Sequence, residues 1–478
     1  MEWSWDWFWA ADYSVARFLL ERGIALIYLL AFVSALHQFP ALLGERGLLP
    51  VPAYLAYLPW RRAPSLFHFG YTDGRLRLLA GAGAALSALL LIGLPQAAPL
   101  PVTMAAWLAL WVLYLSIVTV GQTFYAFGWE SLLLDAGFLA IFLGNAETAP
   151  PLLVILLFRW LVFRVEFGAG LIKMRGDDCW RDLTCMQYHH ETQPMPNPLS
   201  WWFHHLPRPL HRLEVLGNHA AQLVMPFGLF LPQPIAAIAA GLMILTQGYL
   251  VVSGNYAWLN AITIVIAASA LPDALFGPLA GLVATGAPGP PWFIGLVLAV
   301  TAMTVILSWW PVRNMLGRRQ LMNYSFNPFH LVNTYGAFGS VTRERYEVVI
   351  EGTRDAVPDE SAEWREYAFI GKPGDPRRRP RQVAPYHLRL DWLMWFVPLS
   401  PAYAADWLPR LVEKLLDNDA ATLRLMGHNP FPDAPPRWIR ARFFRYRFTS
   451  WRERRETGAW WAREPAGTLL PPVRGAAS

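Results

Sequence analysis

The sequence predicts a polytopic α-helical membrane domain followed by a soluble α+β domain built on an antiparallel β-sheet. Of the 478 residues, 55% are hydrophobic and only 15% are charged, fewer charges than a soluble protein of this size carries. Several stretches of about 18 to 22 residues have few or no charged side chains, which is the length that a helix needs to cross a bilayer. Most of the lysines and arginines follow the last such stretch, among alternating apolar and polar residues that indicate half-buried strands.

A series of apolar segments accounts for the membrane domain. The sequence contains roughly eight or nine of them, each near the length of a spanning helix. They cover residues 17–39, 76–94, 101–120, 130–143, 152–173, 220–231, 235–252, 258–271 and 292–310. The segments at 220–231 and 258–271 are short for a full span, so a re-entrant or interfacial placement fits either of them. The N-terminal stretch "MEWSWDWFWAADYS" predicts an interfacial belt of tryptophans and not a removable signal peptide.

The composition changes after the last apolar segment and divides the chain. We assign residues 1–320 to a transmembrane helical domain with a polar loop at 173–215, and residues 321–460 to a soluble β-rich C-terminal domain. Residues 461–478 are expected to form a disordered tail. Strand-like alternation occurs in "RYEVVIEGT" (345–353), "EWREYAFIG" (363–371), "YHLRLDWLMWF" (386–396) and "RWIRARFFRYRF" (437–448). The leucines of residues 406–419 recur at helical spacing, so an antiparallel sheet with one helix is the simplest packing.

Charged residues inside the apolar segments are the first candidates for chemistry, because burying one at a helix centre costs about 2.5 to 3.5 kcal/mol. They form an intramembrane polar cluster that comprises Arg159, Arg164, Glu166 and Lys173 on one segment and Glu130 and Asp135 on the segment before it. The spacing of Arg159, Glu166 and Lys173 places them near one face of a helix. Two interpretations are open: ion pairs that specify helix packing, or a polar cavity in which Lys173, Glu166 and Glu130 are the catalytic candidates.

A dense polar stretch, "KMRGDDCWRDLTCMQYHHETQPMPNP" (173–198), contains both cysteines of the chain. Cys179 and Cys185 have neither the C-x-x-C spacing of a redox motif nor the spacing of a paired zinc site. A structural disulfide, two free thiols and redox exchange are the alternatives. His189 and His190 are consecutive and cannot both face one ion from a regular helix, and the sequence contains no H-E-x-x-H motif. We therefore expect no metal site.

Motifs that commonly mark enzymes and nucleic-acid-binding proteins are missing from the sequence. It has no P-loop, no GxGxxG and no G-x-S-x-G at a strand-to-helix junction, so we expect no cofactor. The formal net charge of +6 is not accompanied by a recognition module such as a helix-turn-helix, so we expect no nucleic-acid partner. The lipid bilayer is the partner that the composition implies.

Long stretches of the chain resemble the lipase maturation factor family. The residues that carry the resemblance are "LLGERGLLP" (42–50), "GQTFYAFGWESLLLDAGFLAIFL" (121–143), "FRWLVFRVEFGAGLIKMRGDDCWRDLTCMQYHHETQPMPNPLSWW" (158–202), "SGNYAWLN" (253–260) and "NPFHLVNTYGAFGSVTRERYEVVIEGT" (327–353). The loop within the third stretch is the most specific signature, and its residues are Trp180, Arg181, Asp182, His189, His190, Glu191 and Asn197.

The resemblance implies a multi-pass membrane protein that acts as a chaperone-like maturation factor and not as an enzyme. Animal members of the family reside in the endoplasmic reticulum, where they help secreted homodimeric lipases fold and assemble, and their C-terminal domain faces the lumen and engages clients. The expected partners are therefore secreted client proteins such as lipases. The usage of Arg, Ala, Gly and Pro indicates a bacterial member located in the inner membrane; a eukaryotic member would lie in the endoplasmic reticulum membrane.

A shorter similarity supports an alternative function. The stretch "GAGLIKMRGDDCW" (168–180) is similar to the membrane region of vitamin K-dependent γ-carboxylases, in which a lysine acts as a base toward the quinol. Only Lys173 falls on that pattern. The alternative is a membrane-integral enzyme that acts on a quinone-like or other lipid-soluble ligand, with Lys173, Glu166 and Glu130 lining its cavity.

Overall fold

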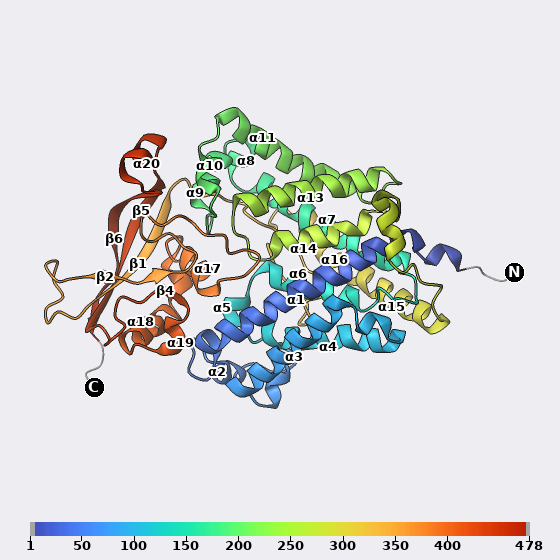
Figure 1. The fold of residues 1–478 in the computed structure, drawn as a ribbon, viewed down its shortest axis with the longest axis horizontal. Helices are drawn as coiled ribbons and strands as arrows, with labels where there is room; N and C mark the ends of the chain where they lie inside the picture. The colour runs from blue at the N-terminus through green and yellow to red at the C-terminus, as the bar shows by residue number, and fades with distance from the viewer. Residues whose placement is uncertain (1–4, 475–478) are drawn as a thin grey trace.

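The chain folds into a bundle of helices that carries a β-rich domain at one end (Figure 1). The computed structural model describes residues 5–474. In Figure 1 the strands lie at the left, and α1 (Ser14–Leu43) runs from the far end of the bundle toward them. The predicted order, a helical membrane domain followed by a domain with an antiparallel sheet, is confirmed.

Helices α1 to α16 build the bundle and its connections. After α1, the longer helices are α3 (Asp73–Ile92), α4 (Leu100–Val118), α6 (Gly128–Ala140), α7 (Leu152–Arg175), α11 (Arg208–His219), α13 (Ile235–Ser253), α14 (Leu259–Ala267) and α15 (Pro291–Leu307). The shorter helices are α2 (Val51–Leu55), α5 (Gln122–Tyr125), α8 (Asp178–Arg181), α9 (Met186–Thr192), α10 (Ser200–His204), α12 (Met225–Gly228) and α16 (Trp309–Leu316).

Five helical segments of the described chain are long and apolar enough to cross a membrane: Ala11–Leu43, Asp73–Ile92, Leu100–Val118, Ile235–Ser253 and Pro291–Leu316. A sixth span results if Leu259–Ala270 and Asp273–Leu282, which meet at a bend of 96°, are counted as one broken helix. The protein is thus a multi-pass membrane protein. The sequence predicted more spans because it also counted α6, which is short, α7, which carries charges, and residues 220–231, which form only a π-helical turn and the short helix α12.

Helices α6 and α7 lie in the interior of the bundle. Helix α6 packs against α1, α4, α7 and α14, and Phe138 is its only residue that is not fully buried. The outer helices expose large apolar side chains instead, such as Leu78 of α3, Leu245 of α13 and Ile306 of α15, which are 70 to 74% exposed. The charged helices occupy the centre because lipid cannot solvate their side chains, whereas the apolar helices can face it.

Exposed tryptophans lie at both ends of the bundle. Trp5 and Trp7 precede α1 at one end, and Trp60, in the connection after α2, and Trp310, in α16, lie toward the other end. An indole ring combines an apolar body with one polar N–H and therefore favours the depth of the lipid headgroups. Trp3 belongs to the expected N-terminal belt but lies outside the described residues.

Residues 200–219 are divided between two helices, α10 and α11. Pro207 and Pro209 stand at the division, where their missing backbone N–H groups would interrupt a continuous helix. Helix α11 exposes Leu210, Leu213 and Leu216 and buries His211. It then continues through one π-helical turn, Ala220–Val224, into α12.

The C-terminal domain is built on a four-stranded antiparallel sheet in the order β2-β1-β5-β6. Its strands are β1 (Arg345–Thr353), β2 (Arg365–Glu366), β5 (Trp438–Phe448) and β6 (Trp461–Arg474), and a second, smaller sheet pairs β3 (Ala368–Phe369) with β4 (Met426–His428). The helices of this domain are α17 (Arg389–Phe396), α18 (Leu408–Leu416), α19 (Ala420–Leu423) and α20 (Trp451–Thr457).

Residues 386–396, predicted to be a strand, contain helix α17 instead. The first six residues of α17 are all buried, and Arg389, His387 and Trp392 contact the membrane bundle. A short segment that is buried on every side shows no reliable period, so its apparent alternation did not identify the structure. Packing against the bundle therefore decided its conformation.

The expected disordered tail is also wrong for residues 461–474, which form β6. Trp461 at the start of β6 is 1% exposed and stacks on Phe448 with a centroid distance of 4.0 Å. The prolines of this strand misled the prediction, but they are tolerated because β6 lies at the edge of the sheet, where half of the backbone N–H groups need no partner. Residues 475–478 lie outside the described part of the chain.

If β6 is an ordered strand, Trp461→Ala will destabilise the C-terminal domain by about 3 to 5 kcal/mol, because it removes a large buried ring. Pulse proteolysis of the full chain in urea measures this change. Val473→Ala, near the exposed end of the same strand, is the matched control and should have a small effect. Equal stability of the two variants would show that residues 461–474 do not form part of the folded domain.

Candidate functional site

The bundle and the C-terminal domain meet at a buried ion pair between Glu130 and Arg389. Nη1 of Arg389, on α17, lies 2.7 Å from Oε1 of Glu130, on α6, and both side chains are 0% exposed. The guanidinium also donates to the carbonyl oxygen of Phe124 at 2.8 Å and lies over the ring of Tyr125, 3.4 Å from its centroid. The hydroxyl of Tyr114 donates to the second oxygen of Glu130. Each charge is thus paired and hydrogen-bonded.

Neutral groups surround this ion pair. Gln38 of α1 accepts the backbone N–H of Arg389 at 2.9 Å and donates to the carbonyl oxygen of His387 at 2.6 Å. The indole N–H of Trp129 donates to Nδ1 of His387 at 3.4 Å. Burial, and after it the positive charge of Arg389, lowers the pKa of His387 to about 4, so this ring is neutral at physiological pH. The junction therefore holds one cation and one anion.

A second ion pair joins the two central helices. Nη1 of Arg164, on α7, lies 2.9 Å from Oδ2 of Asp135, on α6, and both side chains are buried. The same nitrogen donates to the carbonyl oxygen of Asn333 at 2.7 Å, and the hydroxyl of Tyr335 donates to Asp135 at 3.1 Å. The linker between the bundle and the sheet thus contributes to this cluster.

Glu166 and Lys173 belong to a third cluster, in which Gln222 lies between them. Lys173 Nζ donates to Gln222 Oε1 at 2.8 Å, and Gln222 Nε2 donates to Glu166 Oε2 at 3.1 Å. Gln247 donates to the other oxygen of Glu166 at 2.7 Å, and Asn218 accepts a second hydrogen bond from Lys173 at 2.9 Å. Gln222 reaches both charges from the π-helical turn after α11, a feature often found at functional sites.

The three catalytic candidates therefore do not meet in one cavity. Glu130 lies in the junction, whereas Lys173 and Glu166 are bridged by Gln222. A cavity of about 580 Å³ lies elsewhere in the described structure, between α1 and the C-terminal domain, and its lining includes Gln38, but none of the three candidates. Arg159 donates instead to the carbonyl oxygens of Leu229 and Ser269. This arrangement suits helix packing better than proton transfer to a ligand.

The polar loop is held by a disulfide between Cys179 and Cys185. Both cysteines are buried, and the indole N–H of Trp180 donates to the carbonyl oxygen of Phe338 at 2.9 Å. Asp177, which caps α8, forms an ion pair with Arg343 at 2.8 Å, and the hydrogen bond from Arg343 lowers the pKa of Asp177 to about 2. These contacts attach the loop to the segment that leads into β1.

The other signature residues have structural partners. The backbone N–H of Asp182 donates to Asp178, which also pairs with the exposed side chain of Arg181. Asn197 caps the start of α10 by accepting the backbone N–H of Ser200 at 3.0 Å. His189 Nε2 lies 2.8 Å from the hydroxyl of Tyr256, and Glu191 accepts the backbone N–H of Phe448, in β5, at 2.6 Å. The loop thus contacts the membrane bundle and the central strand of the sheet.

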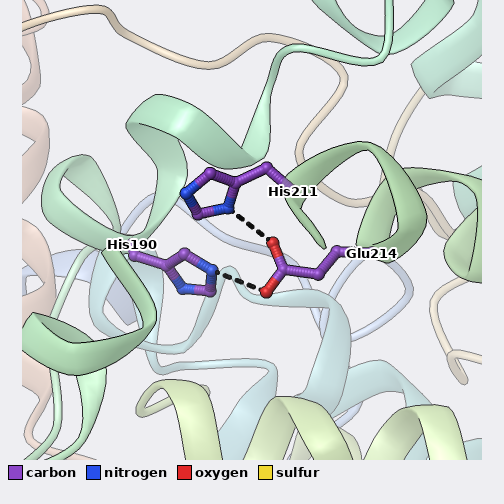
Figure 2. Close-up of side chains that lie close together, drawn as sticks. All are labelled: His190, His211 and Glu214. Atoms are coloured by element: carbon purple, nitrogen blue, oxygen red, sulfur yellow. Dashed lines mark hydrogen bonds and ion pairs between the residues drawn. The ribbon is translucent and has the colours of Figure 1, made fainter. Parts of the chain in front are cut away.

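His190 is the signature residue whose partners the sequence did not suggest. Figure 2 shows His190 of α9 and His211 of α11 both turned toward the carboxylate of Glu214. His190 Nε2 lies 3.3 Å from Oε1 of Glu214, and His211 Nδ1 lies 2.8 Å from Oε2. Burial alone would raise the pKa of Glu214, but hydrogen bonds from both rings outweigh burial and lower it to about 2. These three side chains could hold a metal ion.

Sequence reasoning missed Arg389, Gln222, His211 and Glu214. Two signals were present: the charged residues Arg389 and Asp391 inside the largely apolar run at 386–396, and the i, i+3 spacing of His211 and Glu214, which places both on one face of a helix. Neither signal identifies the partner, because the residues in contact come from distant parts of the sequence.

Removing the cation at the junction should be strongly destabilising. Arg389→Met leaves Glu130 buried without its counter-charge, which costs about 3 to 5 kcal/mol. We expect a large decrease in the thermal midpoint of the full chain in detergent micelles. Glu130→Gln combined with Arg389→Met should recover part of the loss, because no unpaired charge is then buried.

Arg410→Met is the matched control in the same domain. Arg410 pairs with Glu413 at 3.0 Å, but both side chains are about 60% exposed, and an exposed pair contributes only about 0 to 1 kcal/mol. A similar decrease for both single variants would mean that the Glu130–Arg389 pair is not an anchor between the domains.

Comparison with known proteins matches almost the whole chain. The family model described as the lipase maturation factor transmembrane domain matches residues 15–277, and the one described as the lipase maturation factor C-terminal domain matches residues 331–471. Lipase maturation factor 1 of Bos taurus is 42% identical over 97% of this chain and 90% of its own length. The Homo sapiens protein of that name is 42% identical over 96% and 88% of the two lengths, and Homo sapiens lipase maturation factor 2 is 29% identical over 96% and 82%. No solved structure matches. With both family domains in order and nearly full-length similarity to these relatives, the chain belongs to the lipase maturation factor family.

Proposed function

We propose that this protein assists the maturation of lipases, the role that the name of its relatives gives to them, and that it does so by helping secreted lipases fold and assemble at a membrane. The observation that carries the proposal is the 42% identity to lipase maturation factor 1, which extends over 97% of this chain and 90% of the relative. The similarity includes both the membrane bundle and the C-terminal domain. The alternative, a quinone-dependent membrane enzyme, is not favoured, because its candidates Lys173, Glu166 and Glu130 do not line a common cavity.

The disulfide favours the non-cytoplasmic side of the membrane for the C-terminal domain. Disulfides persist in oxidising compartments and are rare in the cytosol. The loop that contains Cys179 and Cys185 is joined to the C-terminal domain through Asp177 and Arg343, so both lie on one side. This is the side on which secreted proteins fold, and we propose that the C-terminal domain engages client lipases there.

The distribution of positive charge favours the opposite orientation, with the C-terminal domain in the cytoplasm. Arginines gather at the same end of the bundle: Arg77 borders the cavity beside the C-terminal domain, and Arg175 at the end of α7 contacts Met315 near the end of α16. An excess of arginine is typical of cytoplasmic loops. We give the disulfide more weight because the charge rule is a statistical bias, and Arg175 and Arg343 here bind protein groups.

For the cellular location we propose the endoplasmic reticulum membrane. The composition of the sequence favoured a bacterial inner membrane, but the relatives described above are cattle and human proteins and give no support to that preference. A reticulum location agrees with an oxidising compartment around the disulfide and with clients that enter the secretory pathway.

Complementation tests the proposed function directly. Expressed in human cells that lack lipase maturation factor 1, this chain should increase the activity of a secreted lipase per unit of lipase protein in the medium. The Arg410→Met variant should do so equally well, whereas Arg389→Met should fail, because its C-terminal domain is no longer anchored to the bundle. Unchanged lipase activity, with the wild-type chain present in the membrane at normal levels, would contradict the proposal.

Labelling of introduced cysteines tests the sidedness. Ser361→Cys is exposed in the C-terminal domain, and Thr285→Cys is exposed in the connection before α15, at the other end of the bundle. In sealed microsomes, an impermeant maleimide should label Thr285→Cys but reach Ser361→Cys only after permeabilisation. The wild-type chain is the negative control, because its two cysteines form a disulfide and should not react with the maleimide. The reverse pattern would place the C-terminal domain in the cytoplasm.

A further inference from the structure

The cluster of His190, His211 and Glu214 takes no part in the ion pairs of the bundle or in the junction at Arg389. Its members come from two helices, α9 within the polar loop and α11 at the end of that loop. We propose that this cluster binds a divalent transition metal ion, zinc in the first instance, through His190 Nε2, His211 Nδ1 and the carboxylate of Glu214. This inference goes beyond the proposed function and does not depend on it.

The donor atoms are already gathered around one point. One ligand atom from each of the three residues lies within 4.8 Å of the other two. Zinc binds imidazole nitrogen at about 2.0 to 2.1 Å and carboxylate oxygen at about 2.0 to 2.2 Å, so ligands of a tetrahedral ion are separated by roughly 3.3 Å. The contact of Glu214 with His190, at 3.3 Å, matches that separation, and its contact with His211, at 2.8 Å, is somewhat shorter. Small side-chain rotations would therefore complete the site.

The chemistry of the donors selects the ion. Two imidazoles and one carboxylate form a ligand set that suits zinc, whereas magnesium and calcium prefer oxygen ligands alone. Three protein ligands leave the fourth tetrahedral position for a water molecule or another group. The side chains of His190 and His211 are 1% and 3% exposed and that of Glu214 is 10% exposed, so the site is largely shielded and Glu214 lies on its more open side.

Neighbouring groups hold the ligands in place. The hydroxyl of Tyr249, on α13, donates to Oε1 of Glu214. Phe203 stacks on the ring of His190 at a centroid distance of 5.6 Å and also meets the ring of Tyr249 edge-on at 5.2 Å. Groups of this kind orient metal ligands and tune their affinity. A metal ion here would fasten α9 to α11 and so fix the polar loop against the bundle.

A hydrogen-bonded cluster without metal is the competing interpretation. In that case both rings must carry a proton on the nitrogen that faces Glu214, and one carboxylate accepts hydrogen bonds from His190, His211 and Tyr249. Zinc would replace the two ring protons by bonds to the same nitrogens. The two interpretations thus use the same geometry but differ in whether the purified protein retains metal.

Metal analysis of the full-length chain distinguishes them. The protein is produced in zinc-supplemented medium with an affinity tag free of histidine, purified in detergent, passed through a desalting column and analysed by plasma mass spectrometry. We expect stoichiometric zinc in the wild type and a decrease of about tenfold or more in His211→Gln and Glu214→Gln. Tyr249→Phe should keep the site but weaken its affinity by roughly 10- to 100-fold.

His428→Gln is the matched control, because His428 is an exposed histidine in β4 far from the cluster in sequence. It should retain the full zinc content. Where a ligand variant does not fold, as judged by size-exclusion chromatography, the wild type decides: after treatment with a chelator it should take up one equivalent of zinc in a calorimetric titration. Absence of bound zinc from the wild type, no uptake in that titration, or equal zinc in His211→Gln and His428→Gln would overturn the proposal.

Discussion

The ion pair between Glu130 and Arg389 fixes the C-terminal domain to the membrane bundle. Both charges are excluded from solvent, and each comes from a different domain. Separating the domains would therefore leave each charge without its counter-charge, which is unfavourable. Tyr114 donates to Glu130, the carbonyl oxygen of Phe124 accepts from the guanidinium of Arg389, and Gln38 accepts the backbone N–H of Arg389. The C-terminal domain is therefore held in one position at the end of the bundle, in contact with α1, α5 and α6, and is not carried on a flexible linker.

The need to pair buried charges also explains which helices lie in the centre of the bundle. Charges on α6 and α7 cannot face lipid, so these helices lie in the centre and pair through Arg164 and Asp135, while apolar helices surround them. Glu166 and Lys173 are too far apart on α7 to pair directly and are joined through Gln222, which the π-helical turn presents. A helix that looked suited to catalysis thus has its charges occupied by packing contacts.

The polar loop links the bundle to the sheet for a second time. Its disulfide shapes the first half, Arg343 binds Asp177 at its start, and Arg345 of β1 donates to the carbonyl oxygens of residues 191, 193 and 194. His190, the first member of the histidine and glutamate cluster, lies between these two attachments along the chain, and His211 and Glu214 follow the second. Two independent attachments hold the C-terminal domain at a defined position relative to the bundle.

Local properties of the sequence determined much of this structure. Hydropathy identified a multi-pass bundle before a β-rich domain, and the period-2 pattern located β1 and β5, because each property is contained in a few consecutive residues. Burial of charged side chains on α6 and α7 was predictable for the same reason. The loop signature indicated the family, since a resemblance between sequences can be recognised without knowing the fold.

Only the tertiary structure decided which residues meet. Arg389 reaches Glu130 across 259 positions of sequence, and His190 meets Glu214 across 24, so neither pairing has a local signal. Helix α17 and strand β6 take their conformations from the surfaces against which they pack, which override an apparent alternation in one case and a proline-rich composition in the other. Sequence patterns therefore predicted what must be buried, whereas the partners and the two corrected elements followed from long-range packing.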